Sequence, residues 1–272
     1  MSAGFCFGVQ RAVTMAVNAL EENGKAVFSL GPIIHNPQEV KRLEEKGIRM
    51  ASTLDEIESG TVIIRSHGAP RGVIDKAVKM GLKVIDATCP LVNRLTERVQ
   101  ELVDKGYQVL IVGDSDHPEV MAVLSYAPDS CLVTRGPDEI EPGFLKEKVG
   151  IVAQTTQPLE NLQSVASYCI ALSREVRTYN TICEATLKRG VEALALARKV
   201  DVMVVVGGKN SGNTKKLAEL VRRSGTETFH IESAPELIGL SIPPEIPVGV
   251  TAGASTPAWI IDEVVEALKM LD

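Results

Sequence analysis

The sequence predicts an α/β protein made of three similar α/β units with parallel sheets. Short runs rich in Val and Ile alternate with helical stretches along the whole chain. Most of these runs are continuously apolar, which is typical of strands buried on both faces of a sheet. Three of the five cysteines recur at intervals of about 90 residues, and the same order of helix, strand and polar loop follows each of them.

The most apolar runs give the expected strands. They are Val62–Arg65, Lys83–Ile85, Gln108–Val112, Gly150–Ala153, Val202–Val206 and Pro247–Thr251. Aromatic residues make up only 4% of the chain, so aliphatic side chains must build the core. The apolar and charged shares, 44% and 24%, are ordinary for a globular protein.

The cysteine spacing defines the repeat. Cys6, Cys89 and Cys183 lie 83 and 94 residues apart, and 89 residues follow the last one. A polar residue that opens a helix follows 30, 28 and 28 residues later, namely Asn36, His117 and Ser211. We therefore expect three units, over residues 1–88, 89–182 and 183–272.

One unit is expected to have a strand fewer than the others. Cys89 follows the run Lys83–Ile85, and Cys183 follows the extended stretch Val176–Asn180. Cys6 has only Met1–Phe5 before it, so the repeat predicts a missing strand at this point.

Charge and hydropathy argue against a nucleic-acid partner and against a membrane partner. The net charge of −6 and a pI near 5.4 argue against a nucleic-acid surface, which usually has a basic excess. No apolar run approaches the roughly 20 residues that span a bilayer, and Met1–Leu20 lacks the layout of a signal peptide. We expect a cytoplasmic protein with no nucleic-acid or membrane partner. In that compartment the cysteines should be buried small residues or metal ligands rather than disulfides.

Polar loops follow the expected strands, at the edge where open α/β sheets bind ligands. Each loop leads into a helix N-terminus, which favours anions. If the units surround a pseudo-threefold axis, these loops face one central cavity that can take a ligand. The candidate side chains are His35, Asn36, Ser66, His67, His117, Glu119, Thr155, Thr156, Ser211, Asn213 and Ser255. This set suits a phosphate group and one proton transfer.

Each candidate also has an ordinary structural interpretation. Asn, Ser and Thr at helix starts are the usual caps, and Glu119 is also a first-turn acid that the helix dipole favours. Three of the four histidines fall at matching strand ends, which favours a function for them. His230 has no partner in the repeat and is interpreted as structural.

The three repeated cysteines point to a metal centre. Symmetry would bring their thiolates together, where they can hold zinc with a water or a [4Fe–4S] cluster with one open iron. There is no C-x-x-C motif. Cys131 and Cys169 have no counterparts in the repeat, and we expect them to be buried small residues.

The motifs resemble those of the LytB/IspH family of 4-hydroxy-3-methylbut-2-enyl diphosphate reductases. The resemblance covers essentially the whole chain, in order. Its motifs are Gly4-Phe5-Cys6-Phe7-Gly8-Val9, His35-Asn36-Pro37, Ser66-His67-Gly68, Asp86-Ala87-Thr88-Cys89-Pro90-Leu91-Val92, His117-Pro118-Glu119-Val120, Gln154-Thr155-Thr156, Cys183 with Ala185-Thr186, Lys209-Asn210-Ser211-Gly212-Asn213-Thr214 and Thr251-Ala252-Gly253-Ala254-Ser255.

The resemblance implies a role for each candidate. Cys6, Cys89 and Cys183 would hold a [4Fe–4S] cluster whose open iron takes the allylic hydroxyl of the substrate. The implied diphosphate ligands are His35, His67, His117, Ser211, Asn213 and Ser255. Gly212 stands where many members have a second serine, so its N–H would replace that hydroxyl contact. Thr155 would lie near the substrate hydroxyl, and Glu119 would be the proton donor, with His117 and Thr155 as candidates to relay a proton to it.

The implied reaction is the last step of the non-mevalonate isoprenoid pathway. Two electrons and two protons remove the hydroxyl as water and give isopentenyl and dimethylallyl diphosphate. The resemblance also implies an electron donor such as ferredoxin or flavodoxin. Three other functions remain open on the residues alone: a quinolinate synthase, a zinc hydrolase with three cysteines and a water, and a non-catalytic redox sensor.

Overall fold

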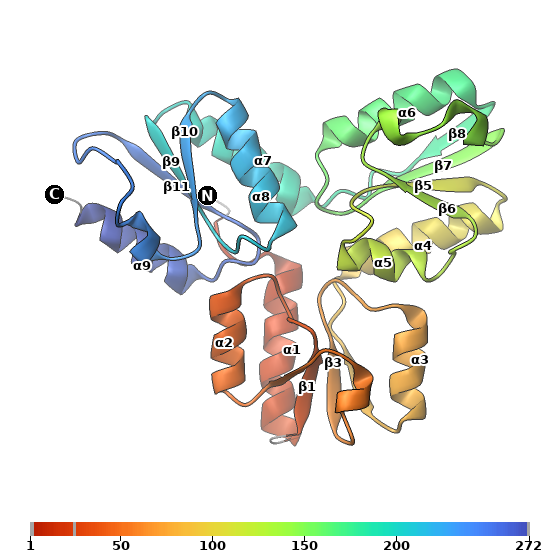
Figure 1. Ribbon diagram of the computed structural model, residues 1–272, viewed down its shortest axis with the longest axis horizontal. Helices are drawn as coiled ribbons and strands as arrows, with labels where there is room; N and C mark the ends of the chain where they lie inside the picture. Colours follow the sequence, from red (N-terminus) through yellow and green to blue (C-terminus); the bar gives the residue numbers. More distant parts are fainter. Residues whose placement is uncertain (1–2, 24–25, 271–272) are drawn as a thin grey trace. The chain divides into compact units, whose positions relative to one another are not determined.

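The computed structural model describes residues 3–23 and 26–270 and is an α/β protein with three parallel sheets (Figure 1). This confirms the predicted fold class. The strands of the three sheets come from successive parts of the chain, 27–86, 108–178 and 202–252. The boundaries predicted for three α/β domains stay a prediction.

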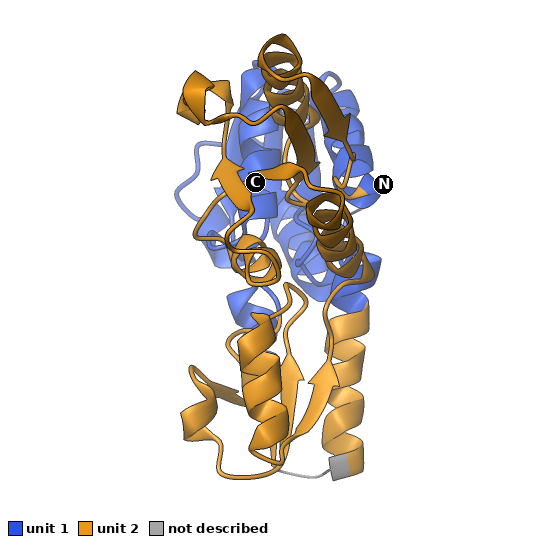
Figure 2. Ribbon diagram, turned by 90° about the vertical axis from the view of Figure 1, so that its right-hand side faces the viewer, with its two compact units in different colours: residues 1–10, 34–46, 184–272 blue, residues 11–33, 47–183 orange. Residues whose placement is uncertain are grey.

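The chain divides into two compact units, coloured separately in Figure 2. Unit 1 comprises Met1–Gln10, Ile34–Lys46 and Glu184–Asp272. Unit 2 comprises Arg11–Ile33 and Gly47–Cys183. Unit 1 therefore contains one sheet and unit 2 contains two.

The first sheet of unit 2 has the strand order β2-β1-β3-β4. Its strands are β1 (Val27–Leu30), β2 (Arg49–Ala51), β3 (Thr61–Ile64) and β4 (Lys83–Asp86). The accompanying helices are α1 (Phe7–Asn23, which begins in unit 1), the short η1 (Leu54–Glu56) and α3 (Arg71–Lys79). Every residue of β3 is buried, as expected for a central strand with an unbroken run of apolar side chains. Val62 packs with Leu54 and Ala77, so η1 and α3 cover one face of this sheet.

The second sheet of unit 2 repeats this order as β6-β5-β7-β8. Its strands are β5 (Gln108–Val112), β6 (Cys131–Thr134), β7 (Lys148–Ala153) and β8 (Glu175–Thr178). The helices are α4 (Pro90–Asp104), α5 (Pro118–Leu124) and α6 (Leu159–Leu172), with the short η2 (Pro137–Glu139) and η3 (Pro142–Phe144). Leu95 of α4 and Val123 of α5 pack with Ile111, which places both helices on one face, and α6 covers the other (Figure 1).

The sheet of unit 1 has the order β10-β9-β11. Its strands are β9 (Val202–Val206), β10 (Glu227–Ile231) and β11 (Val248–Ala252). The helices are α2 (Pro37–Glu45), α7 (Glu184–Ala197), α8 (Gly212–Arg223) and α9 (Ala258–Lys269), with the short η4 (Ala234–Leu237). Alternate residues of β9 pack against helices on opposite faces of the sheet, because successive side chains of a strand point to opposite faces. Met203 packs with α7 and α8, whereas Val204 packs with η4 and α9.

The sheet of unit 1 has one strand fewer than the two sheets of unit 2, as the repeat predicts. β4 lies beside β3, and β8 lies beside β7. Among the described residues no strand takes the corresponding place beside β11. The predicted gap falls partly on residues 1–2, which lie outside the described residues, and residues 3–6 form no strand.

Membrane insertion through a helix finds no support in the fold. Within residues 3–23 and 26–270, every helix is too short or too polar to cross a bilayer.

Candidate functional site

Three helices begin at matching polar residues, as the spacing predicts. The cap of α2 is Asn36, the cap of α5 is His117 and the cap of α8 is Ser211. Each side chain accepts a backbone N–H from the first turn of its helix, at 2.9, 3.2 and 3.3 Å respectively. These caps leave other N–H groups of the first turn available, and the helix dipole adds partial positive charge there.

The three repeated cysteines have the same backbone environment. The N–H of each cysteine donates to a carbonyl in the loop that follows a neighbouring strand. The pairs are Cys6 with Ala254 at 3.0 Å, Cys89 with Ser66 at 2.9 Å and Cys183 with Thr155 at 2.8 Å. Each cysteine directly precedes a helix, α1, α4 or α7. Their equivalence, which the sequence suggests by spacing, is thus present in the hydrogen bonds of both units.

The donor set fits an iron–sulfur cluster. None of the five cysteines forms a disulfide in the described part of the chain. Cys6, Cys89 and Cys183 are partly exposed and stand at the starts of α1, α4 and α7. Cys169 is buried, as predicted, whereas Cys131 is only partly buried, because it lies in the edge strand β6. Burial of the thiol groups raises the pKa of both to about 11.

The other site residues predicted from the sequence divide between the two units. Unit 1 contains Cys6, His35, Ser211, Gly212, Asn213 and Ser255, and unit 2 contains His67, Cys89, His117, Glu119, Thr155 and Cys183. Within each unit, hydrogen bonds and ring contacts connect several of these residues.

In unit 2, Glu119 and Thr155 form a buried pair. The carboxylate of Glu119 accepts the backbone N–H of Thr155 at 2.7 Å and its hydroxyl at 2.8 Å. Glu119 is 2% exposed and Thr155 is 7% exposed. The carbonyl of Thr155 also accepts the N–H of Cys183, so one loop residue contacts both the acid and the segment of a proposed ligand.

His117 joins this pair through the backbone. Its Nδ1 accepts the N–H of Glu119, whereas the hydroxyl of Thr155 contacts the carboxylate itself. A proton relay through either residue stays a prediction. The ring of His67 lies edge-on to the ring of His117, with centroids 5.5 Å apart. Two imidazoles therefore lie together at the start of α5.

In unit 1, a second polar network surrounds Asn213. Its Oδ1 accepts the N–H of Ala254 at 3.4 Å, and its Nδ2 donates to the hydroxyl of Thr186 at 3.2 Å. Ala254 is the residue whose carbonyl holds Cys6. The hydroxyl of Ser255 donates to the carbonyl of His35 at 3.0 Å. Gly212 is the first residue of α8, so its N–H is free of the helical ladder.

Glycines allow these loops to approach closely. A Cβ added to Gly208 would lie 2.8 Å from the carbonyl oxygen of His35. A Cβ added to Gly253 would lie 2.0 Å from the hydroxyl of Thr214. The loops after β9 and β11 are therefore packed too tightly for larger residues at these two positions.

His230 supports the same region from β10. Its Nε2 lies 2.8 Å from the carbonyl oxygen of Gly207, the first residue after β9. Burial lowers the pKa of His230. This contact fits the structural role expected for the histidine that has no partner in the repeat.

Two arginines close in sequence to the cysteines were not among the candidates predicted from the sequence. Arg189 of α7 donates to the carbonyls of Gly4 and Ala252, and Arg11 of α1 donates to the carbonyl of Thr88. The available signal was their position, because Arg11 stands five residues after Cys6 and Arg189 stands six residues after Cys183.

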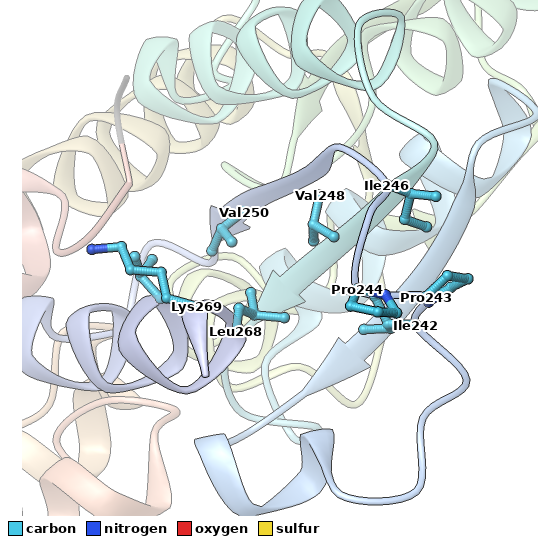
Figure 3. Close-up of a pocket in the computed structure, with 9 residues that line it drawn as sticks. Ile242, Pro243, Pro244, Ile246, Val248, Val250, Leu268 and Lys269 are labelled. Atoms are coloured by element: carbon cyan, nitrogen blue, oxygen red, sulfur yellow. The ribbon is translucent and has the colours of Figure 1, made fainter. Parts of the chain in front are cut away.

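A cavity of about 240 Å³ in unit 1 has a different character (Figure 3). It lies beside β11, between the loop 242–246 and α9. Its lining is Ile242, Pro243, Pro244, Ile246, Val248, Val250, Val265, Leu268 and Lys269, which includes none of the predicted site residues.

The chain is similar to known reductases along its whole length. Residues 1–269 match the family described as LytB protein. A 4-hydroxy-3-methylbut-2-enyl diphosphate reductase from Geobacter metallireducens (strain ATCC 53774 / DSM 7210 / GS-15) is 50% identical over 270 residues, which is 99% of this chain and 95% of the relative. The protein of the same name from Geobacter sulfurreducens (strain ATCC 51573 / DSM 12127 / PCA) is also 50% identical, with the same coverage.

Solved structures agree with the sequence match. A structure of (E)-4-hydroxy-3-methyl-but-2-enyl diphosphate reductase, the terminal enzyme of the non-mevalonate pathway, is 44% identical and has a TM-score of 0.75 over 99% of this chain and 97% of the other. The E-1-hydroxy-2-methyl-but-2-enyl-4-diphosphate reductase from Plasmodium falciparum is 26% identical, with a TM-score of 0.88 over 97% and 85%. Since the family match and the 50% identity both span nearly the whole chain, it belongs to the LytB protein family.

Proposed function

We propose that this chain removes the allylic hydroxyl of 4-hydroxy-3-methylbut-2-enyl diphosphate by reduction. Two electrons and two protons break the C–O bond, release water and give isopentenyl diphosphate and dimethylallyl diphosphate, in the last step of the non-mevalonate pathway. The observation that carries the proposal is the shared backbone environment of Cys6, Cys89 and Cys183, because it identifies three equivalent thiols among five. The family match favours this reaction over a quinolinate synthase, a zinc hydrolase or a redox sensor.

Cys6, Cys89 and Cys183 would hold a [4Fe–4S] cluster with one iron that has no protein ligand. When bound, such a cluster supplies single electrons and a Lewis-acidic iron for the hydroxyl of the substrate, which are functions that no side chain provides. Backbone hydrogen bonds from the three N–H groups hold these cysteine segments in place.

Glu119 would supply a proton to the departing hydroxyl. Hydroxide leaves poorly, and protonation turns the leaving group into water. Thr155 donates two hydrogen bonds to this carboxylate, and both favour its ionised form. The dipole of α5 acts in the same direction, because Glu119 lies in the first turn of that helix. Glu119 must therefore receive a proton during turnover, and the hydroxyl of Thr155 is in direct contact with it for that transfer.

The diphosphate would bind to donors at helix caps and in the loops that follow strands. The proposed ligands are His35, His67, His117, Thr155, Ser211, Gly212, Asn213 and Ser255, with the N–H of Gly212 in place of a hydroxyl. The hydroxyl of Ser255 donates to the carbonyl of His35 in this structure, so it must turn before it can donate to a phosphate oxygen. Helix N-termini are suited to such anions.

The partners follow from the reaction. An electron donor such as ferredoxin or flavodoxin would deliver the two electrons. The net charge of −6 disfavours a nucleic-acid partner, and the absence of disulfides in the described chain fits a cytoplasmic location.

Anaerobic reconstitution followed by kinetics tests the proposal. The chain should bind about four iron and four sulfide per molecule, as expected for a [4Fe–4S] cluster, and should convert the substrate to both products with a strong artificial reductant. Binding of the substrate should weaken first in His35→Ala and His67→Ala. A chain that binds zinc instead of iron contradicts the proposal. So does a chain that has the full iron and sulfide content but turns over no substrate.

A further inference from the structure

We infer that Arg189 and Arg11 are positioning residues that fix the segments leading to Cys6 and Cys89 and favour reduction of the metal centre. The inference rests on the proposed function. Arg189 is 4% exposed. Its Nη1 donates to the carbonyl of Ala252 at 2.8 Å, and both Nη atoms donate to the carbonyl of Gly4, at 3.2 and 3.1 Å. One buried guanidinium in unit 1 thus ties the segment before Cys6 to the end of β11.

This tie adds to the bond that Cys6 makes itself. Ala252 lies two residues before Ala254, whose carbonyl accepts the N–H of Cys6. The segment Gly4–Cys6 is therefore held at both ends against one loop, by the guanidinium at Gly4 and by the amide at Cys6. Gly4 has a φ of 107°, a conformation that favours glycine and turns this carbonyl towards Arg189.

Arg11 has the corresponding role in unit 2. Its Nη1 donates at 2.9 Å to the carbonyl of Thr88, the residue directly before Cys89. The N–H of Cys89 donates to Ser66. The peptide bond between Thr88 and Cys89 is thus held on both sides, at its carbonyl by a guanidinium and at its amide by the carbonyl of Ser66.

The two arginines follow one rule along the sequence. Each lies in a helix that starts at one cysteine, and each holds the segment before another cysteine. The third cysteine is supported differently, since the hydroxyl of Thr181 contacts both the N–H and the carbonyl of Ala153, at 2.8 and 2.6 Å. Arg94, five residues after Cys89, is exposed and provides a matched control.

Charge gives these contacts a consequence beyond geometry. A guanidinium stays protonated in proteins and its planar fork can donate to two carbonyls at once, which a lysine ammonium reproduces poorly. A permanent positive charge near a cysteine ligand stabilises the more negative, reduced form of a cluster, and net charge is one of the quantities that set its potential. Arg189 and Arg11 should therefore raise the reduction potential.

Two measurements on the full chain test this inference. The first is the midpoint potential of the reconstituted protein, and the second is hydrogen exchange of the Cys6 amide in the cluster-free protein. Arg189→Met should lower the equilibrium constant for one-electron reduction about tenfold, or about 59 mV, and should speed the exchange at least tenfold. Arg189→Lys keeps the charge, so its potential should stay near the wild-type value while the exchange is still faster. Arg94→Met should change neither quantity.

The outcomes separate the inference from the proposed function. A wild-type chain that assembles no iron and sulfide contradicts the proposed function, whereas the exchange measurement still tests the positioning. A potential or an exchange rate in Arg189→Met equal to that in Arg94→Met overturns the inference. If Arg189→Met does not fold, Arg11→Met tests the same two quantities at Cys89.

Discussion

The carboxylate of Glu119 is held by two donors of a single residue, the amide and the hydroxyl of Thr155, at 2.7 and 2.8 Å. The carbonyl of the same threonine accepts the N–H of Cys183. The proposed proton donor and one proposed metal ligand are therefore fixed by one residue of one loop. A displacement of this loop would change the position of both groups together.

Replacement of Glu119 tests its role as an acid. Glu119→Gln keeps the size of the side chain but removes the transferable proton, so turnover should fall on the order of 10²-fold or more. Substrate affinity should change little, since the proposed diphosphate contacts are made by other residues. Anaerobic kinetics alongside direct binding of the substrate measures both effects. The control is Glu160→Gln, because Glu160 is a first-turn acid of α6 that is exposed. Equal turnover in the two variants would leave Glu119 as a helix-start acid only.

The cysteines can be sorted by iron content. Each of Cys6→Ser, Cys89→Ser and Cys183→Ser should abolish cluster assembly, because the proposed cluster has only these three protein ligands. Cys131→Ala and Cys169→Ala should retain full iron and sulfide, because burial keeps these two thiols protonated, with a pKa of about 11. Iron and sulfide analysis after anaerobic reconstitution measures the result. Normal iron in any of the three serine variants would refute the ligand assignment.

His230 should make stability depend on pH. Burial is the largest cause that lowers its pKa below the usual 6.5, so the unfolded chain binds the proton more readily than the folded one. Its contribution to stability is present above pH 6.5 and is lost as the pH falls from that value through the lowered pKa. Thermal unfolding of the wild type and of His230→Gln, compared between pH 8 and pH 5, measures this. The Tm of the wild type should fall further between pH 8 and pH 5 than the Tm of the variant. An equal fall in both proteins would contradict the lowered pKa of His230.

The close approach of the loop after β11 to helix α8 should not tolerate a methyl group. In Gly253→Ala the new Cβ would overlap the hydroxyl of Thr214, which lies 2.0 Å away. Overpacking of this kind costs about 1–3 kcal/mol of unfolding free energy. Gly72→Ala is the control, because nothing lies within 4 Å of its Cβ and it is part of α3. Chemical denaturation should show a loss in the first variant and none in the second, and the double change with Thr214→Ala should recover part of it.

Sequence patterns located the buried strands because their signal is local. β9 is an unbroken apolar run, β5 and β7 carry no polar side chain after their first residue, and almost all residues of the three strands are buried. The edge strands β2, β6 and β10 gave no such signal. Their residues are largely half-buried or exposed, so polar side chains are tolerated and the runs look like loops.

In the candidate site, too, the sequence predicted the local contacts and not the long-range ones. The caps Asn36, His117 and Ser211 followed from spacing, since a cap bonds to residues within its own first turn. The contacts of Arg189 and Arg11 span 185 and 77 residues, and no local pattern encodes them. Only folding of the repeat brings such groups to the cysteine segments.

The cap of α5 also selects the tautomer of an imidazole. Because Nδ1 of His117 accepts the amide hydrogen of Glu119, a neutral ring carries its proton on Nε2. The backbone thus decides which ring nitrogen is the donor. An asparagine at this position would still cap the helix, as Asn36 does for α2, but it would have no second nitrogen on the far side of a ring. At this position helix formation and the proposed diphosphate contact use opposite atoms of one side chain.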